Sequence, residues 1–250
     1  MEYTVAAVRE ALGVLMIIAH NPGLGVTEIG KRAGITKART YRMLVTLEEA
    51  SFVRRDKDAT TYSLGPISLV LGLAAQQQVS VTRLAGKYMA SLQERFNETI
   101  AVLVRDDLES VTVAQIDSTH DVRVQIPLGK RRPLYAGASG KVLLAYAPAD
   151  VQARVFEGDI VRLSPNTIVS KTKLKQEVKR IVEQGHAQSS GEIAADIVAL
   201  AAPIFDADGH ASSTLSMAIP VGRTPSDLSK HLQQLKASAA ALSAELGWKG

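Results

Sequence analysis

Five basic side chains lie close together near the start of the chain, with no acidic residue between them. They are Lys31, Arg32, Lys37, Arg39 and Arg42. Arginine can pair with both acceptors of a guanine edge and lysine neutralises phosphate, so these residue types suit double-stranded DNA. A run of this kind is more often a solvated surface. The choice between the two interpretations depends on the elements that position these side chains.

A second group of residues suits an anion. Gly137–Lys141 is a stretch of small residues that opens a predicted helix, and the first N–H groups of a helix have no partner within it. Such groups can bind a carboxylate, but small residues would equally allow a helix to pack tightly on a sheet. Arg123 and Arg132 are candidate carboxylate partners because arginine can form two parallel hydrogen bonds to this group. Surface charge is the alternative for both.

The sequence gives little support for a catalytic site or a metal site. The sequence has no phosphate-binding loop, no His-x-x-x-His pair and no G-x-S-x-G motif, and its five histidines are scattered. The absence of cysteine excludes thiolate metal ligands and a cysteine nucleophile. Asp206 and Asp208 precede Gly209, which indicates a hairpin tip rather than a carboxylate site. We therefore expect no enzyme activity, no metal site and no cofactor.

The basic residues fall within a predicted arrangement of three helices. The predicted elements are a helix over Val5–His20, a short helix over Thr27–Ala33 that Thr27 caps, a turn at Gly34, and a third helix from the Thr36 cap to about Ala50. In the first helix, Val8, Leu12, Leu15 and Ala19 recur at helical spacing and form the expected buried face.

A short helix, a glycine turn and a helix with a basic outer face are typical of a helix-turn-helix, and two predicted strands over 52–55 and 61–64 add a wing. We predict that Arg39 and Arg42 contact base edges. The predicted phosphate contacts are Thr36, Lys37, Tyr41 and Arg54, and Ala38 lies on the same outer face. A small helical domain with a basic surface is the alternative.

The chain is expected to contain two domains and a linker. We assign residues 1–65 to the winged helix-turn-helix, 66–80 to a linker helix and 81–250 to a second domain. The linker helix, Pro66–Gln78, is too apolar for a free tether, which indicates packing either between subunits or within the chain. Its apolar centre, Ile67–Ala75, is much shorter than the roughly 20 residues that span a bilayer, so no membrane span is expected.

The second domain is predicted to be α+β, with an antiparallel sheet covered by helices. The predicted strands are 99–104, 111–116, 122–126, 197–205 and 211–219, and the predicted helices are 82–96, 139–146 and 174–184. A final helix is expected to open at Thr224–Asp227, which places an N-cap, a proline and an acid in the favoured order.

Composition narrows the class of protein. The 250 residues carry 29 basic and 25 acidic side chains, and the net charge of +4 divides equally between the parts before and after Gly65. A hydrophobic fraction of 46% excludes a disordered chain, and the absence of cysteine fits the cytoplasm. Aromatic residues make up only 4%, which disfavours single-stranded nucleic acid and architectural DNA binding.

Several segments together resemble the IclR family of bacterial transcription regulators. Pro133–Ala145, which reads PLYAGASGKVLLA, is similar to the family signature PLHATAxGKALLA. The segments Ile35–Leu47, Phe52–Arg54 and Tyr62–Gly65 also match, as do Ala201–Asp206, Asp208–Gly209 and Pro220. The resemblance extends from about Val5 to Arg223.

This resemblance implies a winged helix-turn-helix, a linker helix and a GAF-like ligand-binding domain. It also implies homodimers or homotetramers that bind palindromic operator DNA and respond to small metabolites. Carried over position by position, the implied effector site contains Ala138, Ser139, Ser189, Ala199, Ser216 and Ala218, to which we add Arg132. Ala199 stands where many members have cysteine and Ala218 where a second serine is common, so we expect a more apolar carboxylic acid, aromatic or longer-chain.

The resulting prediction is a DNA-binding transcription regulator whose operator affinity is controlled by a small organic acid. The alternative is an enzyme or small-molecule-binding protein with an accessory winged-helix domain. The sequence leaves open the effector, the operator, activation or repression, and dimer or tetramer.

Overall fold

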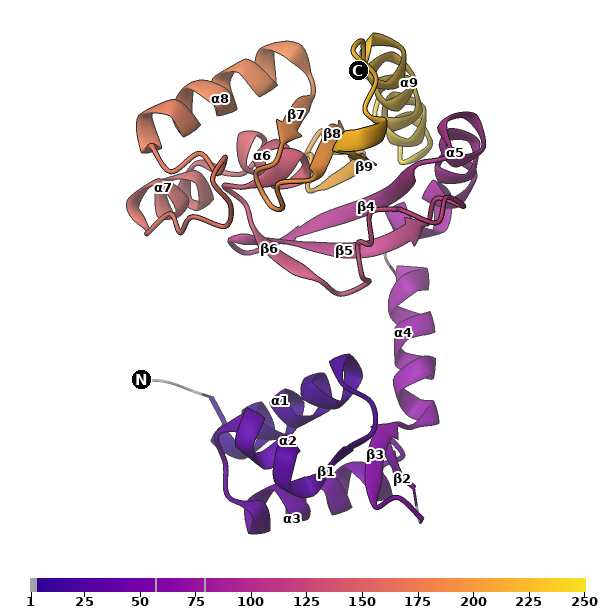
Figure 1. Cartoon of the computed structure of the whole chain (residues 1–250), viewed down its shortest axis with the longest axis vertical. Coiled ribbons are helices and arrows are strands. Elements are labelled where there is room, and N and C mark those ends of the chain that lie inside the picture. The colour runs from indigo at the N-terminus through magenta and orange to yellow at the C-terminus, as the bar shows by residue number, and fades with distance from the viewer. Residues whose placement is uncertain (1–3, 57, 79) are drawn as a thin grey trace. The chain divides into compact units, whose positions relative to one another are not determined.

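The computed structural model describes residues 4–56, 58–78 and 80–250. It contains two compact units, residues 1–78 and 79–250 (Figure 1). Within the described ranges, no helix is long and apolar enough to cross a membrane.

The first unit is a helical domain with a small antiparallel sheet. Its elements are α1 (Ala6–His20), β1 (Leu24–Gly25), α2 (Val26–Ala33), α3 (Lys37–Glu49), β2 (Val53–Arg55), β3 (Thr61–Leu64) and α4 (Pro66–Gln78). The strand order is β1-β3-β2, so the expected hairpin has a third, two-residue strand that the sequence did not reveal.

The core of this unit shows that the predicted buried face of α1 is wrong. The core residues are Val14, Ile18, Ile29, Leu44, Val53 and Tyr62. Val8 and Leu12 are instead exposed, at 56% and 57%. Apolar residues occur on most sides of α1, so periodicity alone did not select the face that packs on α2 and α3.

The turn between α2 and α3 has the geometry that its residues require. Gly34 adopts φ +68°, and its N–H caps the carbonyl groups of α2. Gly30 lies so close to α3 that a Cβ atom there would be 2.7 Å from the Thr40 hydroxyl, which fixes the close approach of the two helices. The Thr36 cap is confirmed, because its hydroxyl accepts the Arg39 N–H. The predicted Thr27 cap is wrong, because α2 begins at Val26 without a side-chain cap.

The second unit is built around one antiparallel sheet. Its helices are α5 (Ser80–Phe96), α6 (Gly137–Ala145), α7 (Ala149–Glu157), α8 (Lys171–Gln184) and α9 (Ser229–Glu245), with a short 3₁₀ turn at Val221–Arg223. Its strands are β4 (Thr99–Asp106), β5 (Glu109–Ile116), β6 (Arg131–Pro133), β7 (Ala187–Ser190), β8 (Ile197–Ile204) and β9 (Ser213–Pro220). They are ordered β6-β5-β4-β9-β8-β7, which confirms the α+β class.

The two faces of the sheet differ in side-chain size. Ile100, Val102, Leu200 and Met217 belong to a core that α5 and α9 complete. On the other face, which α6 covers with α7 and α8 packed against it, β9 pairs Ala218 with Ala199 and Ser216 with Ala101 and Ala201 (Figure 1). Directly opposed residues share a face, so this register gathers small side chains beneath α6.

Two predictions for this unit are wrong, namely one strand and the start of the last helix. Residues 122–126 are irregular rather than a strand, and the Val124 carbonyl accepts the Thr99 hydroxyl instead of joining the ladder. The edge strand beside β5 is β6. The last helix begins at Ser229, because the Asp227 carboxylate accepts the backbone N–H and the hydroxyl of Ser229 and so forms a turn after the expected start.

Two elements, α7 and β7, are not predicted from the sequence, whereas the hairpin tip after β8 is confirmed. There the Asp206 carboxylate accepts the N–H groups of Asp208 and His210. These local hydrogen bonds explain why an aspartate occupies this position of the turn.

Replacing Thr36 with alanine should destabilise the first unit by about 1 kcal/mol, because the cap of α3 loses its acceptor. Thr36→Ser keeps the hydroxyl and serves as the control. Denaturant unfolding of both variants measures the difference, and equal stability of Thr36→Ala and the unmodified protein would show that this cap is energetically silent.

Candidate DNA-binding face and effector pocket

The predicted DNA contacts are all exposed residues of the first unit. Thr40 and Leu44 are buried, so the side of α3 that carries them faces the core of the first unit. This set of seven residues consists of Thr36, Lys37, Ala38, Arg39, Tyr41, Arg42 and Arg54. A basic helix with a free outer side has the shape that enters a major groove.

The basic side chains divide between two sides of α3. Lys37 and Tyr41 border a groove shared with α2 and the wing. Arg39 and Arg42 border a more apolar groove shared with Val8 and other residues of α1. Arg39 is not free, because its Nε atom lies 2.6 Å from the Glu10 Oε2 atom of α1.

Local hydrogen bonds order the wing. The Arg54 Nε–H donates to the Ser63 hydroxyl across the two strands at 2.9 Å. The Asp56 carboxylate accepts the N–H groups of Ala59 and Asp58, and these hydrogen bonds lower the pKa of the exposed Asp56 carboxyl. Arg54 is thereby oriented at the start of the hairpin.

The second unit contains a pocket of about 90 Å³ between the first turn of α6 and the sheet. Its wall includes six of the seven predicted effector residues, namely Arg132, Ala138, Ser139, Ala199, Ser216 and Ala218. The pocket exists because the register places alanine and serine under α6, where larger side chains would fill the space. Gly140 keeps α6 close to β6, since a Cβ there would lie 2.9 Å from the Pro133 carbonyl oxygen.

Two other candidate residues lie away from the pocket wall. Ser189 is on β7, and its hydroxyl accepts the N–H of Ala138 in α6 at 3.1 Å. The Ala138 N–H therefore has an internal partner, contrary to the expectation that it is free for a ligand. Arg123 is exposed and donates to the His120 carbonyl oxygen.

Arg132 is the one charged residue among the described residues of the pocket wall. Burial lowers the pKa of its guanidinium, and across the described residues no acidic group lies within ion-pair distance of it. The remaining wall is largely alanine, glycine, valine, leucine and isoleucine. A desolvated cation in an apolar pocket suits an anion with an apolar body.

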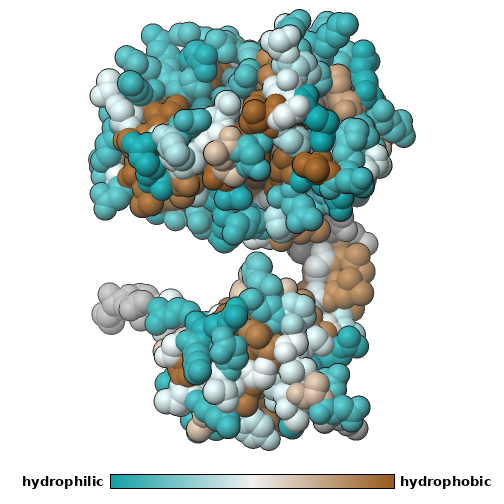
Figure 2. All heavy atoms as spheres, viewed as in Figure 1, coloured by the Kyte–Doolittle hydropathy of each residue, from teal (hydrophilic) through white to brown (hydrophobic). Residues whose placement is uncertain are grey.

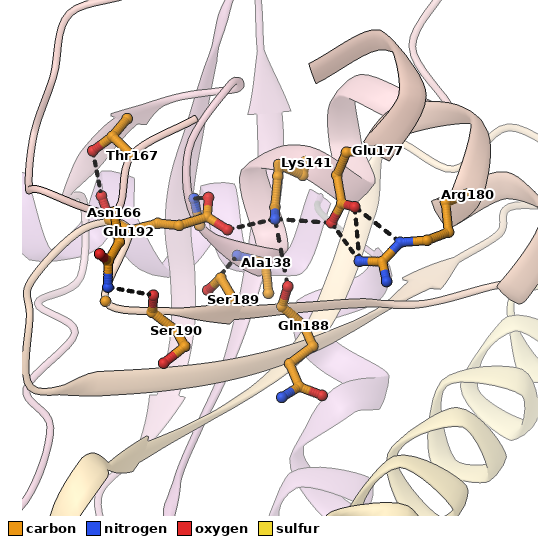
Figure 3. Close-up of polar contacts among 12 residues, drawn as sticks. Ala138, Lys141, Asn166, Thr167, Glu177, Arg180, Gln188, Ser189, Ser190 and Glu192 are labelled. Carbon is orange, nitrogen blue, oxygen red and sulfur yellow. Dashed lines mark hydrogen bonds and ion pairs between the residues drawn. The ribbon is translucent and has the colours of Figure 1, made fainter. Parts of the chain in front are cut away.

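A buried lysine holds the first turn of α6 in place (Figure 3). Lys141 is 1% exposed, and its Nζ atom lies 2.5 Å from Glu192 Oε1 and 3.0 Å from Glu177 Oε1. It also donates to the Gln188 carbonyl oxygen at 3.4 Å. The other carboxylate oxygen of Glu192 accepts the Gly137 N–H at 3.1 Å. Glu192 therefore joins the ammonium group to the start of the helix.

The charges in this network balance. Arg180 also pairs with Glu177, so two cations face two carboxylates (Figure 3). Burial raises the pKa of Glu177, but its hydrogen bonds and charge interactions with Arg180 and Lys141 outweigh this effect, and the net shift lowers the pKa. The lowered pKa favours the ionised form of the Glu177 carboxyl.

A neighbouring segment fixes the loop that carries Glu192. The Thr167 hydroxyl donates to the Glu192 carbonyl oxygen at 2.8 Å, and the Asn166 amide donates to the Ser190 carbonyl oxygen at 3.3 Å (Figure 3). The next residue, Ile193, lines the pocket and lies 3.0 Å from where a Cβ on Gly137 would be. Sequence reasoning missed Glu177 and Glu192, and a lysine within a stretch of small residues was the available signal.

Taken together, these features define a class of protein. A winged helix-turn-helix with an exposed basic helix is joined in one chain to a sheet domain with a small, cation-bearing pocket. This combination is that of a DNA-binding regulator with a domain suited to a small ligand.

Comparison with known proteins gives the family. Residues 7–57 match the IclR helix-turn-helix domain, and residues 73–244 match the bacterial transcriptional regulator IclR C-terminal domain. The chain belongs to the IclR family of DNA-binding transcription regulators.

Relatives match over nearly the whole chain. The transcriptional regulator KdgR of Escherichia coli K12 is 30% identical over 98% of this chain and 94% of its own length. KipR of Bacillus subtilis 168 is 28% identical over 96% of this chain and 97% of its own length. The structure of an IclR regulator from Alicyclobacillus acidocaldarius is 28% identical and has a TM-score of 0.88, covering 98% of this chain and all of that one.

Lys141→Met should destabilise the second unit by about 3–5 kcal/mol, because it leaves two carboxylates buried without their shared cation. Lys179→Met on α8 is the matched control, since the Lys179 side chain is 81% exposed and its loss should change stability by less than about 0.5 kcal/mol. Urea unfolding monitored by circular dichroism compares the two variants. Equal stabilities would contradict the structural role of the buried network.

Proposed function

We propose that this regulator binds palindromic operator DNA as a homodimer and that a small organic acid controls its operator affinity. The observation that carries the effector assignment is Arg132, a half-buried cation on the wall of an otherwise uncharged pocket in the described part of the chain. A carboxylate would compensate the desolvated guanidinium, and the apolar wall would bury the rest of the ligand.

The identity of the wall residues favours an apolar acid. Ala199 and Ala218 oppose each other on β8 and β9 and supply methyl groups rather than hydrogen-bond donors. A keto acid the size of pyruvate would leave polar groups unpaired against this surface, whereas an aromatic or longer-chain acid would bury apolar area there. An IclR homologue from Microbacterium hydrocarbonoxydans, whose structure has a TM-score of 0.86 at 21% identity, was crystallised with 4-hydroxybenzoate, which makes this acid a suitable first probe.

The apolar surface of α4 supports the dimer. Leu69, Val70, Leu71 and Leu73 are each more than half exposed within the first unit, and Figure 2 shows the apolar surface along this helix. A second copy of the chain would cover it and place two α3 helices on the half-sites of a palindrome. Binding to operator DNA also places the protein in the cytoplasm.

A thermal-shift screen of carboxylic acids tests the effector assignment, because a ligand that binds the folded state raises the melting temperature. We expect 4-hydroxybenzoate or a longer-chain acid to stabilise the protein more than pyruvate does. Arg132→Gln should weaken binding of the best acid by tenfold or more, since a hydrogen bond to a charged group contributes roughly 1.5–3 kcal/mol. Arg123→Gln is the control outside the pocket. Tighter binding of pyruvate, or unchanged binding to Arg132→Gln, would contradict the proposal.

A mobility-shift assay on the DNA beside the gene tests the DNA contacts. Arg39→Ala should lose roughly 1–3 kcal/mol of operator affinity and relax specificity at one base pair. Arg123→Ala, in the other unit, should leave affinity unchanged. Addition of the acid found in the screen should then change operator affinity, and an unaffected complex would refute effector control.

A further inference from the structure

The ion pair between Glu10 and Arg39 connects α1 to the candidate recognition helix. The Arg39 Nε atom lies 2.6 Å from Glu10 Oε2, and the Glu10 side chain is 26% exposed. Its Oε2 atom is shielded from solvent, and within the described ranges it has no hydrogen-bond partner. Arg39 is thus the charged partner that compensates this carboxylate oxygen.

The other two cations on α3, Lys37 and Arg42, differ from Arg39 in their charged neighbours. For Lys37 and Arg42, no acidic group lies within 4.0 Å across residues 4–56, 58–78 and 80–250. These two charges are fully available to a polyanion. Arg39, in contrast, has the Glu10 carboxylate within ion-pair distance.

Moving Arg39 away from Glu10 has a cost. The shielded Oε2 atom would lose its compensating charge, and an unsatisfied buried oxygen is more costly than an exposed one. A phosphate is present along every DNA sequence, and an Arg39 side chain that leaves Glu10 to contact one gives up this ion pair. The ion pair therefore lowers the net gain of a phosphate contact.

We propose that Glu10 is a positioning residue that holds Arg39 away from the phosphates of unrelated DNA and so lowers non-specific affinity. This inference rests on the proposed DNA contact of Arg39.

Non-specific binding of a mixed-sequence 30-base-pair duplex, followed by fluorescence anisotropy over a range of salt concentrations, tests the proposal. Glu10→Gln should bind this duplex more tightly than the unmodified protein. Its plot of log affinity against log salt should be steeper by about 0.9, the value for one further phosphate contact. Glu10→Gln/Arg39→Ala should match Arg39→Ala, because the gain acts through Arg39.

Two controls separate this effect from others. Glu49→Gln removes one exposed negative charge from the other end of α3 and should leave the salt slope unchanged. Glu10→Ala also removes the remaining acceptor and should give at least the gain of Glu10→Gln, so it carries the test if the glutamine variant fails to fold in a thermal melt.

Three results would overturn the role of Glu10. They are an unchanged salt slope in both Glu10 variants, an equal gain in the Arg39→Ala background, and an equal gain in Glu49→Gln. Each leaves DNA binding by the protein intact. Failure of the unmodified protein to bind the duplex even at low salt would instead refute the proposed DNA contacts together with this inference.

Discussion

The burial of one ammonium group constrains the half of the second unit that contains the pocket. Lys141 is shielded from solvent and must therefore be compensated where it lies. Glu177 comes from α8 and Glu192 from the loop after β7, so the compensation joins three separate segments. Glu192 also accepts the Gly137 N–H, and the same residue that neutralises the lysine therefore sets the first turn of α6.

The pocket depends on that placement and on the register of the sheet. Ser216 and Ala218 leave space beneath α6, and Ile193 is held at the wall by the loop that Glu192 anchors. In the same region, the Gly137 and Ala138 N–H groups already have the partners Glu192 and Ser189. Arg132 is consequently more important to our effector proposal than the helix N-terminus, which we had expected to supply the donors.

The first unit uses charge in a comparable way at its surface. Thr36 begins α3 and Gly30 allows it to approach α2 closely, so the exposed side of α3 is defined by local rules. The pairing of Arg39 with Glu10 is not local, because the two residues belong to different helices. Of the five positive charges clustered in the sequence, some are therefore paired with acidic side chains in the folded unit, and fewer remain uncompensated.

The sequence by itself determined the family, the α+β class, the helix-turn-helix with its Thr36 cap, and six residues of the pocket wall. These features rest on motifs, local hydrogen bonds and hydrophobic periodicity, which act within a few residues. Only the tertiary structure decided which side of α1 is buried, that residues 122–126 form no strand, and that Glu10, Glu177 and Glu192 compensate particular cations. Those outcomes depend on contacts between residues far apart in the chain, and the spacing of residues along one segment carries no information about them.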